Sequence, residues 1–219
     1  MSASTIHKRI GEIKSKLFTI LWYKRMFYQM GSHSSIHPPF FTRNPQYMEL
    51  GHHVSIGPYC RIEVHPAPVR SKAPKPFLQI GNRVRLEHGV NVSCHQSLII
   101  EDEVLIAGGC YIGDNNHSMD PEGPRYLLQP LSGSPVVIER GVWLGQNVCV
   151  LAGSRIGERS IIGAGSVVNG HIPPFSIAVG SPAKVVKQYC FETKEWKKVN
   201  HSSEPSSSWS SSSQCLMAE

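Results

Sequence analysis

The sequence is short of charged residues, which make up 17% of the chain against about 25% in average usage. Coiled coils are rich in Glu, Lys and Ala, and most disordered chains combine low hydrophobicity with high net charge. The scarcity of charge therefore excludes a coiled coil and most disordered classes for the chain as a whole. Glycine and proline, with 19 and 16 residues, are abundant instead, so we expect short strands separated by frequent turns.

Paired cysteines and long apolar runs are also missing. The six cysteines show no C-x-x-C spacing, and several stand at apolar positions, where a small buried thiol in a reducing compartment is expected. No segment reaches the roughly 18 apolar residues of a membrane span. The stretch 17–23 is too short for a signal-peptide core and runs directly into Lys24 and Arg25. These absences predict a cytoplasmic protein.

The net charge of +6 is concentrated at one end. Residues 1–30 carry six lysines and arginines against the single acid Glu12, so that little excess charge remains for the rest of the chain. A protein that binds nucleic acid would spread its basic residues over a face. We therefore expect no nucleic-acid partner.

The basic segment has the pattern of an amphipathic helix. Its aliphatic residues recur at steps of three and four: Ile6, Ile10, Ile13, Leu17 and Leu21. This spacing predicts a helix over 5–29, within an N-terminal unit of residues 1–30. Such a helix can lie on an anionic membrane surface, as a peripheral contact at the inner membrane face, or pack on the protein's own core. Both alternatives remain open at this point.

From Leu50 onward, aliphatic residues recur every six positions. The longest unbroken series is Ile138, Leu144, Val150, Ile156, Ile162 and Val168. Glycine often follows the aliphatic residue, and a small or branched residue stands four positions after it. This period fits neither an amphipathic helix nor a hairpin sheet, and is typical of a parallel β-helix in which each hexapeptide forms one strand and a turn. The sequence predicts an all-β fold of this kind over 44–182.

Two stretches interrupt the repeats, and the repeats stop after Pro182. Residues 66–77 and 118–135 are predicted loops, and long loops on a regular solenoid are often functional. Residues 183–199 are predicted to form a short capping helix. The Ser-rich tail, residues 200–219, is predicted to be disordered.

Three segments resemble one family. The sequences DNNHSMDP at 114–121, VWLG at 142–145 and GSPAKVV at 180–186 resemble the hexapeptide acyltransferases, among them the galactoside and maltose O-acetyltransferases and the O-acetyltransferases of capsule and lipopolysaccharide synthesis. The resemblance implies a left-handed β-helix and a homotrimer. It also implies that acetyl-CoA binds between neighbouring chains, so that each active site takes residues from two subunits.

The same resemblance assigns the chemistry to His117. A sugar hydroxyl is a weak nucleophile, whereas a thioester is already activated, so the reaction needs a base that works near neutral pH, as imidazole does. His117 is the implied general base for direct attack on the thioester. A carboxylate, with Asp114 as the candidate, or a backbone carbonyl would fix its tautomer. The alternative for Asp114 is a turn residue.

The developing oxyanion needs a hydrogen-bond donor. In the galactoside branch, the backbone N–H three residues after the tryptophan donates, which corresponds to Gln146 here. Trp143 itself would wall the acceptor or pantetheine site, or pack as a corner aromatic at the trimer seam.

The resemblance also implies a set of residues that bind acetyl-CoA: Ala164, Asn169, Gly170, Lys184 and Lys187. Ala164 would contact the pantetheine arm through its backbone, and the lysines would meet the phosphates. The family commonly has TKDIPP where this chain has NGHIPP at 169–174, which removes one expected phosphate contact.

The acceptor differs from that of the galactoside branch. Glu87 stands where that branch has an acceptor-binding asparagine, which argues against galactoside or maltose. The segment 129–138 is closer to the polysaccharide enzymes. The expected acceptor is a sugar hydroxyl in a surface polysaccharide or its lipid-linked glycan precursor.

Three other functions use the same scaffold. An amino-sugar N-acetyltransferase differs from the O-acetyltransferase only in its acceptor. A non-enzymatic scaffold is the second alternative, and it would not need His117 within its motif. The γ-type carbonic anhydrases need three zinc-binding histidines, the last two closely spaced, whereas the nearest histidines to His117 on either side are His95 and His171. We therefore expect no metal.

Overall fold

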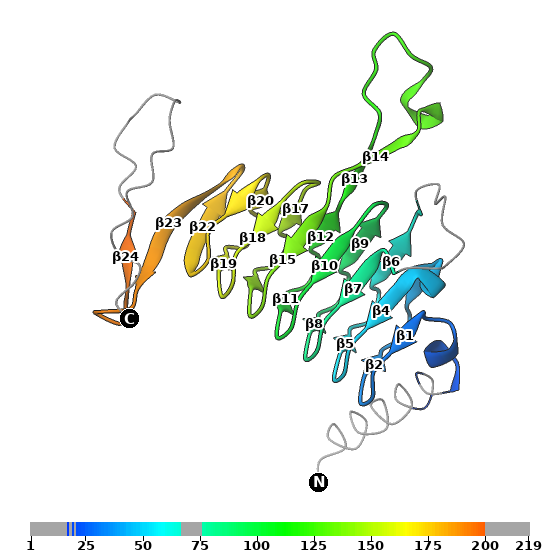
Figure 1. Cartoon of the computed structure of the whole chain (residues 1–219), viewed down its shortest axis with the longest axis horizontal. Helices are drawn as coiled ribbons and strands as arrows, with labels where there is room; N and C mark the ends of the chain where they lie inside the picture. The colour runs from blue at the N-terminus through cyan, green and yellow to red at the C-terminus, as the bar shows by residue number, and fades with distance from the viewer. Residues whose placement is uncertain (1–16, 18, 20, 67–75, 200–219) are drawn as a thin grey trace.

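The chain folds into a parallel β-helix with three sheets (Figure 1). The structure is a computed structural model that describes residues 17, 19, 21–66 and 76–199. The chain visits sheet A, sheet B and sheet C in turn, so each coil adds one strand to each sheet. The turns between sheets form three edges, which we call the A/B, B/C and C/A edges. The prediction of an all-β parallel β-helix is confirmed.

The strands are short, as the hexapeptide period requires. Sheet A contains β1 (Gln29–Met30), β4 (Met48–Leu50), β7 (Leu78–Ile80), β10 (Leu98–Ile100), β15 (Val136–Ile138), β18 (Arg155–Ile156) and β21 (His171–Ile172). Sheet B contains β2 (Ser35–Ile36), β5 (Ser55–Ile56), β8 (Arg85–Leu86), β11 (Leu105–Ile106), β16 (Trp143–Leu144), β19 (Ile161–Ile162), β22 (Ser176–Gly180), β23 (Ala183–Cys190) and β24 (Glu195–Lys198). Sheet C contains β3 (Phe41–Arg43), β6 (Arg61–Val64), β9 (Asn91–Cys94), β12 (Tyr111–Gly113), β17 (Cys149–Val150) and β20 (Val167–Val168).

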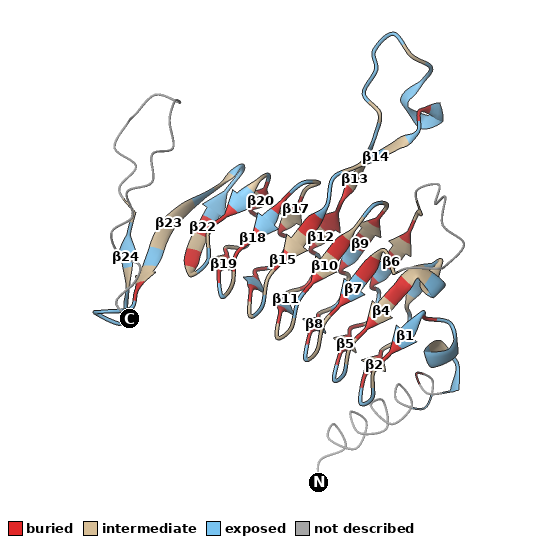
Figure 2. Ribbon diagram, viewed as in Figure 1, coloured by how far each residue is buried: buried red, intermediate tan, exposed pale blue. Residues whose placement is uncertain are grey.

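The repeated aliphatic residues form the core. Leu50, Ile56 and Ile62 of one coil are almost fully buried, and so are the aliphatic residues at the same positions of the following coils. Buried segments recur from coil to coil along the sheets (Figure 2). Coils stack so closely that a Cβ on Gly145 would lie 2.7 Å from the backbone nitrogen of Ala164. Only glycine fits at such an approach. Stacking therefore buries one continuous apolar column that no single coil could form alone.

The β-helix begins one coil earlier than the repeats predict. Strands β1, β2 and β3 pair in parallel with β4, β5 and β6. The six-residue step is present there as Met30, Ile36 and Thr42. Methionine and threonine at aliphatic positions obscured the repeat, so the predicted start at residue 44 was too late.

The predicted N-terminal helix falls mainly on residues 1–16, 18 and 20, which lie outside the described residues. Leu17, Thr19 and Leu21 have helical backbone, but the prediction is wrong over 23–30. There the chain forms the 3-10 turn η1 (Tyr23–Arg25) and then β1. The reason is burial, because Phe27 and Met30 pack into the core of the first coil. Within the described residues, no helix is long and apolar enough to cross a membrane.

The predicted C-terminal helix over 183–199 is also wrong. The chain reverses after β22, and β23 and β24 add two antiparallel strands to sheet B. Valines and aromatics such as Val185, Val186 and Tyr189 favour strands over helix. Pairing also satisfies the open backbone edge that β22 would otherwise present. Residues 200–219, the predicted disordered tail, lie outside the described residues.

The two predicted loops interrupt the coils as expected. Residues 67–75 of the first loop lie outside the described residues. The second is a projecting hairpin (Figure 1), closed at its base by β13 (Asn115–His117) and β14 (Leu131–Gly133) and carrying the 3-10 turn η3 (Tyr126–Leu128). A third such turn, η2 (Pro45–Tyr47), precedes β4.

Candidate active site

His117 stands at the base of the projecting hairpin, on the C/A edge. It is the last residue of β13 and pairs with Leu131 of β14. A further bond from the Ser118 N–H to the Pro130 carbonyl, at 2.9 Å, extends the ladder. The ring is therefore held by a rigid hairpin base although its side chain is exposed.

The tautomer of His117 follows from the hydrogen bond of its ring to a backbone carbonyl. The Nδ1 atom lies 3.2 Å from the backbone carbonyl oxygen of Gln129. A carbonyl can only accept, so this bond requires the proton on Nδ1. The lone pair is then on Nε2, which is the atom that can take a proton from an acceptor. Of the two groups expected to fix the tautomer, the structure provides the backbone carbonyl.

Gln129 was not identified from the sequence, yet its side chain organises the hairpin. It is 5% exposed. Its Nε2 donates to the carbonyl oxygens of Asp120 at 2.8 Å and Pro124 at 2.7 Å, and its Oε1 accepts from the Asp120 N–H at 3.1 Å. The only sequence signal is a glutamine just before Pro130, which is too weak to find without the structure.

Asp114 is fully buried. Its carboxylate accepts hydrogen bonds from the backbone N–H groups of His95, Gln96 and Ser97 at 2.6, 2.8 and 2.7 Å. It also accepts from the Asn115 side chain at 3.0 Å. The contacts support the alternative of a turn-organising residue, because Asp114 holds the preceding C/A turn under the hairpin.

Gln146 and Ala164 lie in successive turns of the B/C edge. The carbonyl oxygen of Gln146 accepts the N–H of Gly165 at 2.8 Å. The N–H of Gln146 itself donates to no acceptor within the part of the chain that the structure describes. This N–H is therefore available to an oxyanion, as is the equivalent N–H of Gly108 one coil earlier. Gln146 therefore differs from Gly108 in the coil to which it belongs, and not in the availability of its N–H group.

Trp143 belongs to an apolar row on the outer face of sheet B. It pairs with Leu105 on one side and Ile161 on the other, and Ile161 pairs with Ile177. Trp143 is 47% exposed. The row runs across the strands from β16, next to the Gln146 turn, toward β23. The extended apolar part of a ligand could lie along it.

The lysines predicted to bind phosphate follow in the same sheet. Lys187 pairs with Ile177, and Lys184 pairs with Val179. Val179 packs on the backbone at Gly163, which places Lys184 beside the Ala164 turn. Ala164, Lys184 and Lys187 are thus brought to one side of the molecule.

Asn169 and Gly170 are placed elsewhere. They follow β20 and form the C/A turn, on the edge that carries His117. Gly170 has a φ of +115°, a conformation open mainly to glycine, so its identity follows from the turn. The residues predicted for acetyl-CoA are therefore divided between two edges of one chain.

Glu87 lies on the B/C edge, two coils before Gln146. Its carboxylate forms an ion pair with Arg85 of β8 at 2.5 Å. The pair gives this end of sheet B a polar surface, in contrast to the apolar row around Trp143.

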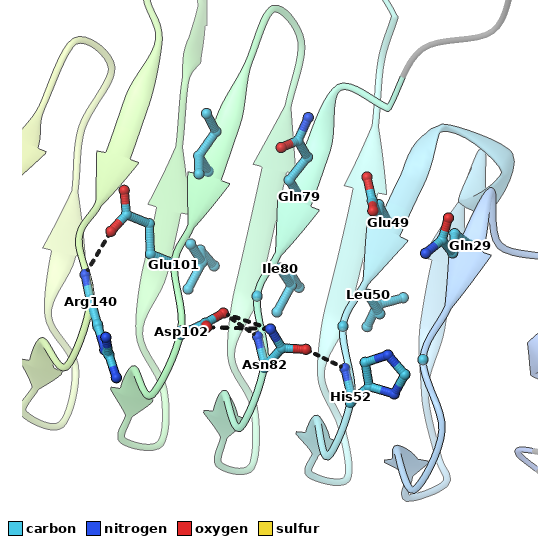
Figure 3. A pocket seen from close by; sticks show the side chains of 15 residues that line it. Gln29, Glu49, Leu50, His52, Gln79, Ile80, Asn82, Glu101, Asp102 and Arg140 are labelled. Carbon is cyan, nitrogen blue, oxygen red and sulfur yellow. Dashed lines mark hydrogen bonds between the residues drawn. The ribbon is translucent and has the colours of Figure 1, made fainter.

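A separate groove of about 440 Å³ lies on sheet A and the A/B edge (Figure 3). Its polar side chains link successive coils: the Asn82 side chain accepts the His52 N–H at 2.9 Å, and Asp102 accepts the Asn82 N–H at 2.6 Å. None of the predicted site residues lines it. In the described ranges, no group of three or more His, Cys, Asp or Glu residues could hold a metal ion.

One chain does not bring the predicted catalytic groups together. His117 follows sheet C at the C/A edge, whereas Gln146 precedes sheet C at the B/C edge. About five residues of extended chain separate the two edges, or roughly 15 Å. The proton acceptor and the oxyanion donor of a single active site must lie within a few ångströms of one carbonyl.

Comparison with known proteins agrees with the repeat pattern. The profile of the family described as bacterial transferase hexapeptide (six repeats) matches residues 135–170. WbbJ of Escherichia coli, named for O-acetyl transfer in lipopolysaccharide biosynthesis, is 33% identical over 168 residues, which cover 74% of this chain and 82% of that protein. Rv3034c of Mycobacterium tuberculosis, named as an acetyltransferase, is 38% identical over 140 residues, which cover 64% of this chain but 44% of that protein.

Solved structures share the fold. A galactoside acetyltransferase in complex with coenzyme A superposes with a TM-score of 0.55 at 19% identity, covering 90% of each chain. The hexapeptide-repeat acetyltransferase VCA0836 of Vibrio cholerae, complexed with acetyl-CoA, has a TM-score of 0.56 at 24% identity, covering 85% of this chain and 90% of that chain. With WbbJ matched over most of its length, the chain belongs to the hexapeptide-repeat acyltransferase family.

Proposed function

We propose that the protein transfers an acetyl group from acetyl-CoA to a sugar hydroxyl in the synthesis of a surface polysaccharide, such as capsule or lipopolysaccharide. The observation that carries the proposal is the geometry of His117, whose Nδ1 is bound to the Gln129 carbonyl while the residue remains exposed. The extended similarity to WbbJ supports the O-acetyl acceptor class.

The chemistry is a direct transfer. The acceptor oxygen attacks the thioester carbonyl carbon while Nε2 of His117 takes the hydroxyl proton. The Gln146 N–H donates to the oxyanion that forms. The carbon–sulfur bond then breaks, and the imidazolium returns the proton to the departing thiolate, which leaves as CoA. No covalent acyl-enzyme is needed.

The separation of the two edges supports a trimer with shared sites. The C/A and B/C edges border the same sheet C. In a closed threefold ring with sheet C facing the axis, the C/A edge of one chain meets the B/C edge of the next. His117 of one chain would then approach Gln146, Trp143 and Ala164 of its neighbour. This is a heterologous contact, which closes after three copies.

The polar end of sheet B suits the acceptor. The Arg85–Glu87 ion pair lies two coils from Gln146 on the same edge. A carboxylate and a guanidinium can each bind sugar hydroxyls, whereas the apolar row around Trp143 suits the acyl chain and pantetheine. The acceptor and the donor would thus approach the reacting carbonyl from opposite ends of one face.

The test is acetyl-CoA-dependent thiol release with a panel of acceptors. We expect release with a free or lipid-linked glycan that carries hydroxyls, and the acetyl group as an ester that mild base removes. Base-stable acetyl on an amino sugar would instead show N-acetylation. No release with any acceptor, from a protein that binds acetyl-CoA, would contradict the proposed transfer.

A further inference from the structure

The groove on sheet A contains a column of glycines. In three successive coils a glycine directly follows the sheet A strand and lines the groove: Gly31, Gly51 and Gly81. The coils stack so closely there that a Cβ on Gly51 would lie 2.7 Å from the carbonyl carbon of Gly81. The next coil has Glu101 at this position, so the column without side chains ends there. The resulting volume of about 440 Å³ falls in the range of about 300–1,000 Å³ that is usual for ligand sites.

A row of polar side chains lies beside this column. Gln29, Glu49 and Gln79 occupy paired positions on β1, β4 and β7 (Figure 3). Ile99 of β10 continues the row. Paired positions on neighbouring parallel strands share one face of the sheet. Within the described residues, none of the three polar side chains forms a hydrogen bond or an ion pair, so their donors and acceptors are available to a ligand.

The carboxylates on the other side of the groove already have donors. Asp102 accepts the N–H of Asn82 at 2.6 Å and its side-chain amide at 3.1 Å. Glu101 accepts the N–H of Arg140 at 3.0 Å. Among the described residues that line the groove, Glu49 is therefore the one carboxylate without a partner. A site for a cationic ligand would leave more of its carboxylates unoccupied, so the groove suits a neutral polar ligand better.

His52 adds a hydrogen-bond donor to the groove. Its Nδ1 lies 3.0 Å from the backbone nitrogen of Ser32. A backbone N–H can only donate, so Nδ1 accepts and the neutral ring carries its proton on Nε2. The groove thus offers amides that donate and accept, a carboxylate that accepts and an imidazole that donates. A sugar fits this mixture, because each hydroxyl group both donates and accepts.

The row also has the length of a short glycan. Three strand spacings of about 4.8 Å separate Gln29 from Ile99, or about 14 Å. A pyranose ring with its bridging oxygen extends a glycan by about 5 Å, given single bonds of about 1.5 Å. The row therefore spans about three sugar residues. Ile99 at its end offers an apolar contact for the C–H face of a sugar ring.

This end of the row lies near the hairpin that carries His117. Ile99 is three residues from Gln96, or about 10 Å along the chain. Gly133 at the base of the hairpin lies so close to Gln96 that an added Cβ would be 2.9 Å from the Gln96 Cβ. Leu131, the pairing partner of His117, is two residues from Gly133, or about 7 Å. A glycan that leaves the groove over the hairpin base therefore reaches His117 after about three further sugar residues.

We infer that the sheet A groove binds the part of the acceptor glycan that lies beyond the acetylated sugar, through Gln29, Glu49 and Gln79. The inference rests on the proposed function, because it takes a glycan as the acceptor. It adds a binding region on a different sheet from the Arg85–Glu87 ion pair. It also predicts selectivity, since an acceptor of about six sugar residues fills both the groove and the active site, whereas a single sugar cannot.

The test compares Gln79→Ala with Gln188→Ala. Both glutamines are exposed on strands, but Gln188 lies on β23 of sheet B and is the matched control. Calorimetry on the full-length protein measures binding of maltohexaose, cellohexaose, isomaltohexaose and chitohexaose, and of the monosaccharides glucose and N-acetylglucosamine. We expect at least one hexasaccharide to bind about tenfold or more tightly than its monosaccharide. Gln79→Ala should raise that Kd about three- to tenfold, as loss of a hydrogen bond predicts, and Gln188→Ala should leave it unchanged.

The possible outcomes separate this inference from the proposed function. No binding of any hexasaccharide, or an equal loss of affinity in Gln188→Ala, would overturn the inference. A change in the oligomeric state of Gln79→Ala by sedimentation would show that this face joins copies of the chain, and would also overturn it. Thiol release from acetyl-CoA is scored separately. Hexasaccharide binding that depends on Gln79, without release with any acceptor, would contradict the proposed function alone.

Discussion

His117 and Gln129 act together at the residue scale. The Gln129 carbonyl fixes the His117 ring, and the Gln129 side chain fixes the hairpin that positions this carbonyl. A base held in this way needs no carboxylate partner to set its tautomer. Asp114 is occupied by three backbone N–H groups, so the proposed mechanism gives the catalytic and the structural role to different residues.

Replacing the base should remove turnover without removing the donor. His117→Ala is expected to lower kcat by at least about 10²-fold, because general-base catalysis contributes this much or more. The Kd for acetyl-CoA should change little. Steady-state kinetics and calorimetry check both, with the distant His53→Asn as a control. Wild-type turnover in His117→Ala would reject the assignment.

Gln129 should affect turnover more than donor binding. Gln129→Leu keeps the volume but loses the three side-chain hydrogen bonds that hold the hairpin. The His117 ring would then lose its fixed orientation. We expect kcat to fall about tenfold or more, with an unchanged KM for acetyl-CoA. If kcat stayed at the wild-type value, the hairpin would not be needed to position His117.

Glu103 provides a pH-dependent test at the A/B edge. Hydrogen bonds from Arg140 and then Arg83 lower the pKa of the Glu103 carboxyl to about 2. A folded pKa below the unfolded one contributes stability that is present above about pH 4.5 and is lost as the pH falls toward 2. The Tm difference between wild type and Glu103→Gln should therefore shrink over this range. A difference that grows on acidification would contradict the ion pairs.

At the scale of elements, the repeat pattern predicted the coils because each hexapeptide repeats the same inward aliphatic position. It missed the first coil, where Met30 and Thr42 occupy those positions. The pattern also failed at both ends of the chain. There the spacing of the apolar residues fits a helix, but the segments form strands that pair with the open edge of a sheet. Such pairing depends on contacts between distant residues, which a local pattern does not contain. Gln129 was missed for the same reason.

Asp114 should stabilise the turn below the hairpin. Asp114→Ala removes the acceptor of three backbone N–H groups at a buried position. Hydrogen bonds to a charged group contribute about 1.5–3 kcal/mol each, so we expect a loss of at least about 3 kcal/mol in the free energy of unfolding. Urea denaturation measures this. A loss below about 1 kcal/mol would show that water replaces the carboxylate.

At the scale of the whole molecule, the positions of the edges matter most. The predicted residues group on the C/A edge and on the B/C edge with the outer face of sheet B, and the two groups border sheet C from opposite sides. The resemblance to the family predicted each of these residues. It did not predict that they lie on two separate edges, because this depends on the order of the sheets around the coil. The left-handed winding of the coil and the membrane contact of residues 1–30 stay predictions.

Subunit complementation tests the shared site most directly. His117→Ala disables the C/A edge, and Ala164→Glu blocks the donor surface of the B/C edge; each variant alone should be a nearly inactive trimer by sedimentation. When the two are co-expressed, random mixing in a threefold ring leaves about a quarter of the sites with both edges intact. The account predicts that the co-expressed population as a whole recovers about a quarter of wild-type activity, all of it in the mixed trimers. Mixed trimers that remain as inactive as the single variants would contradict a site built from two chains.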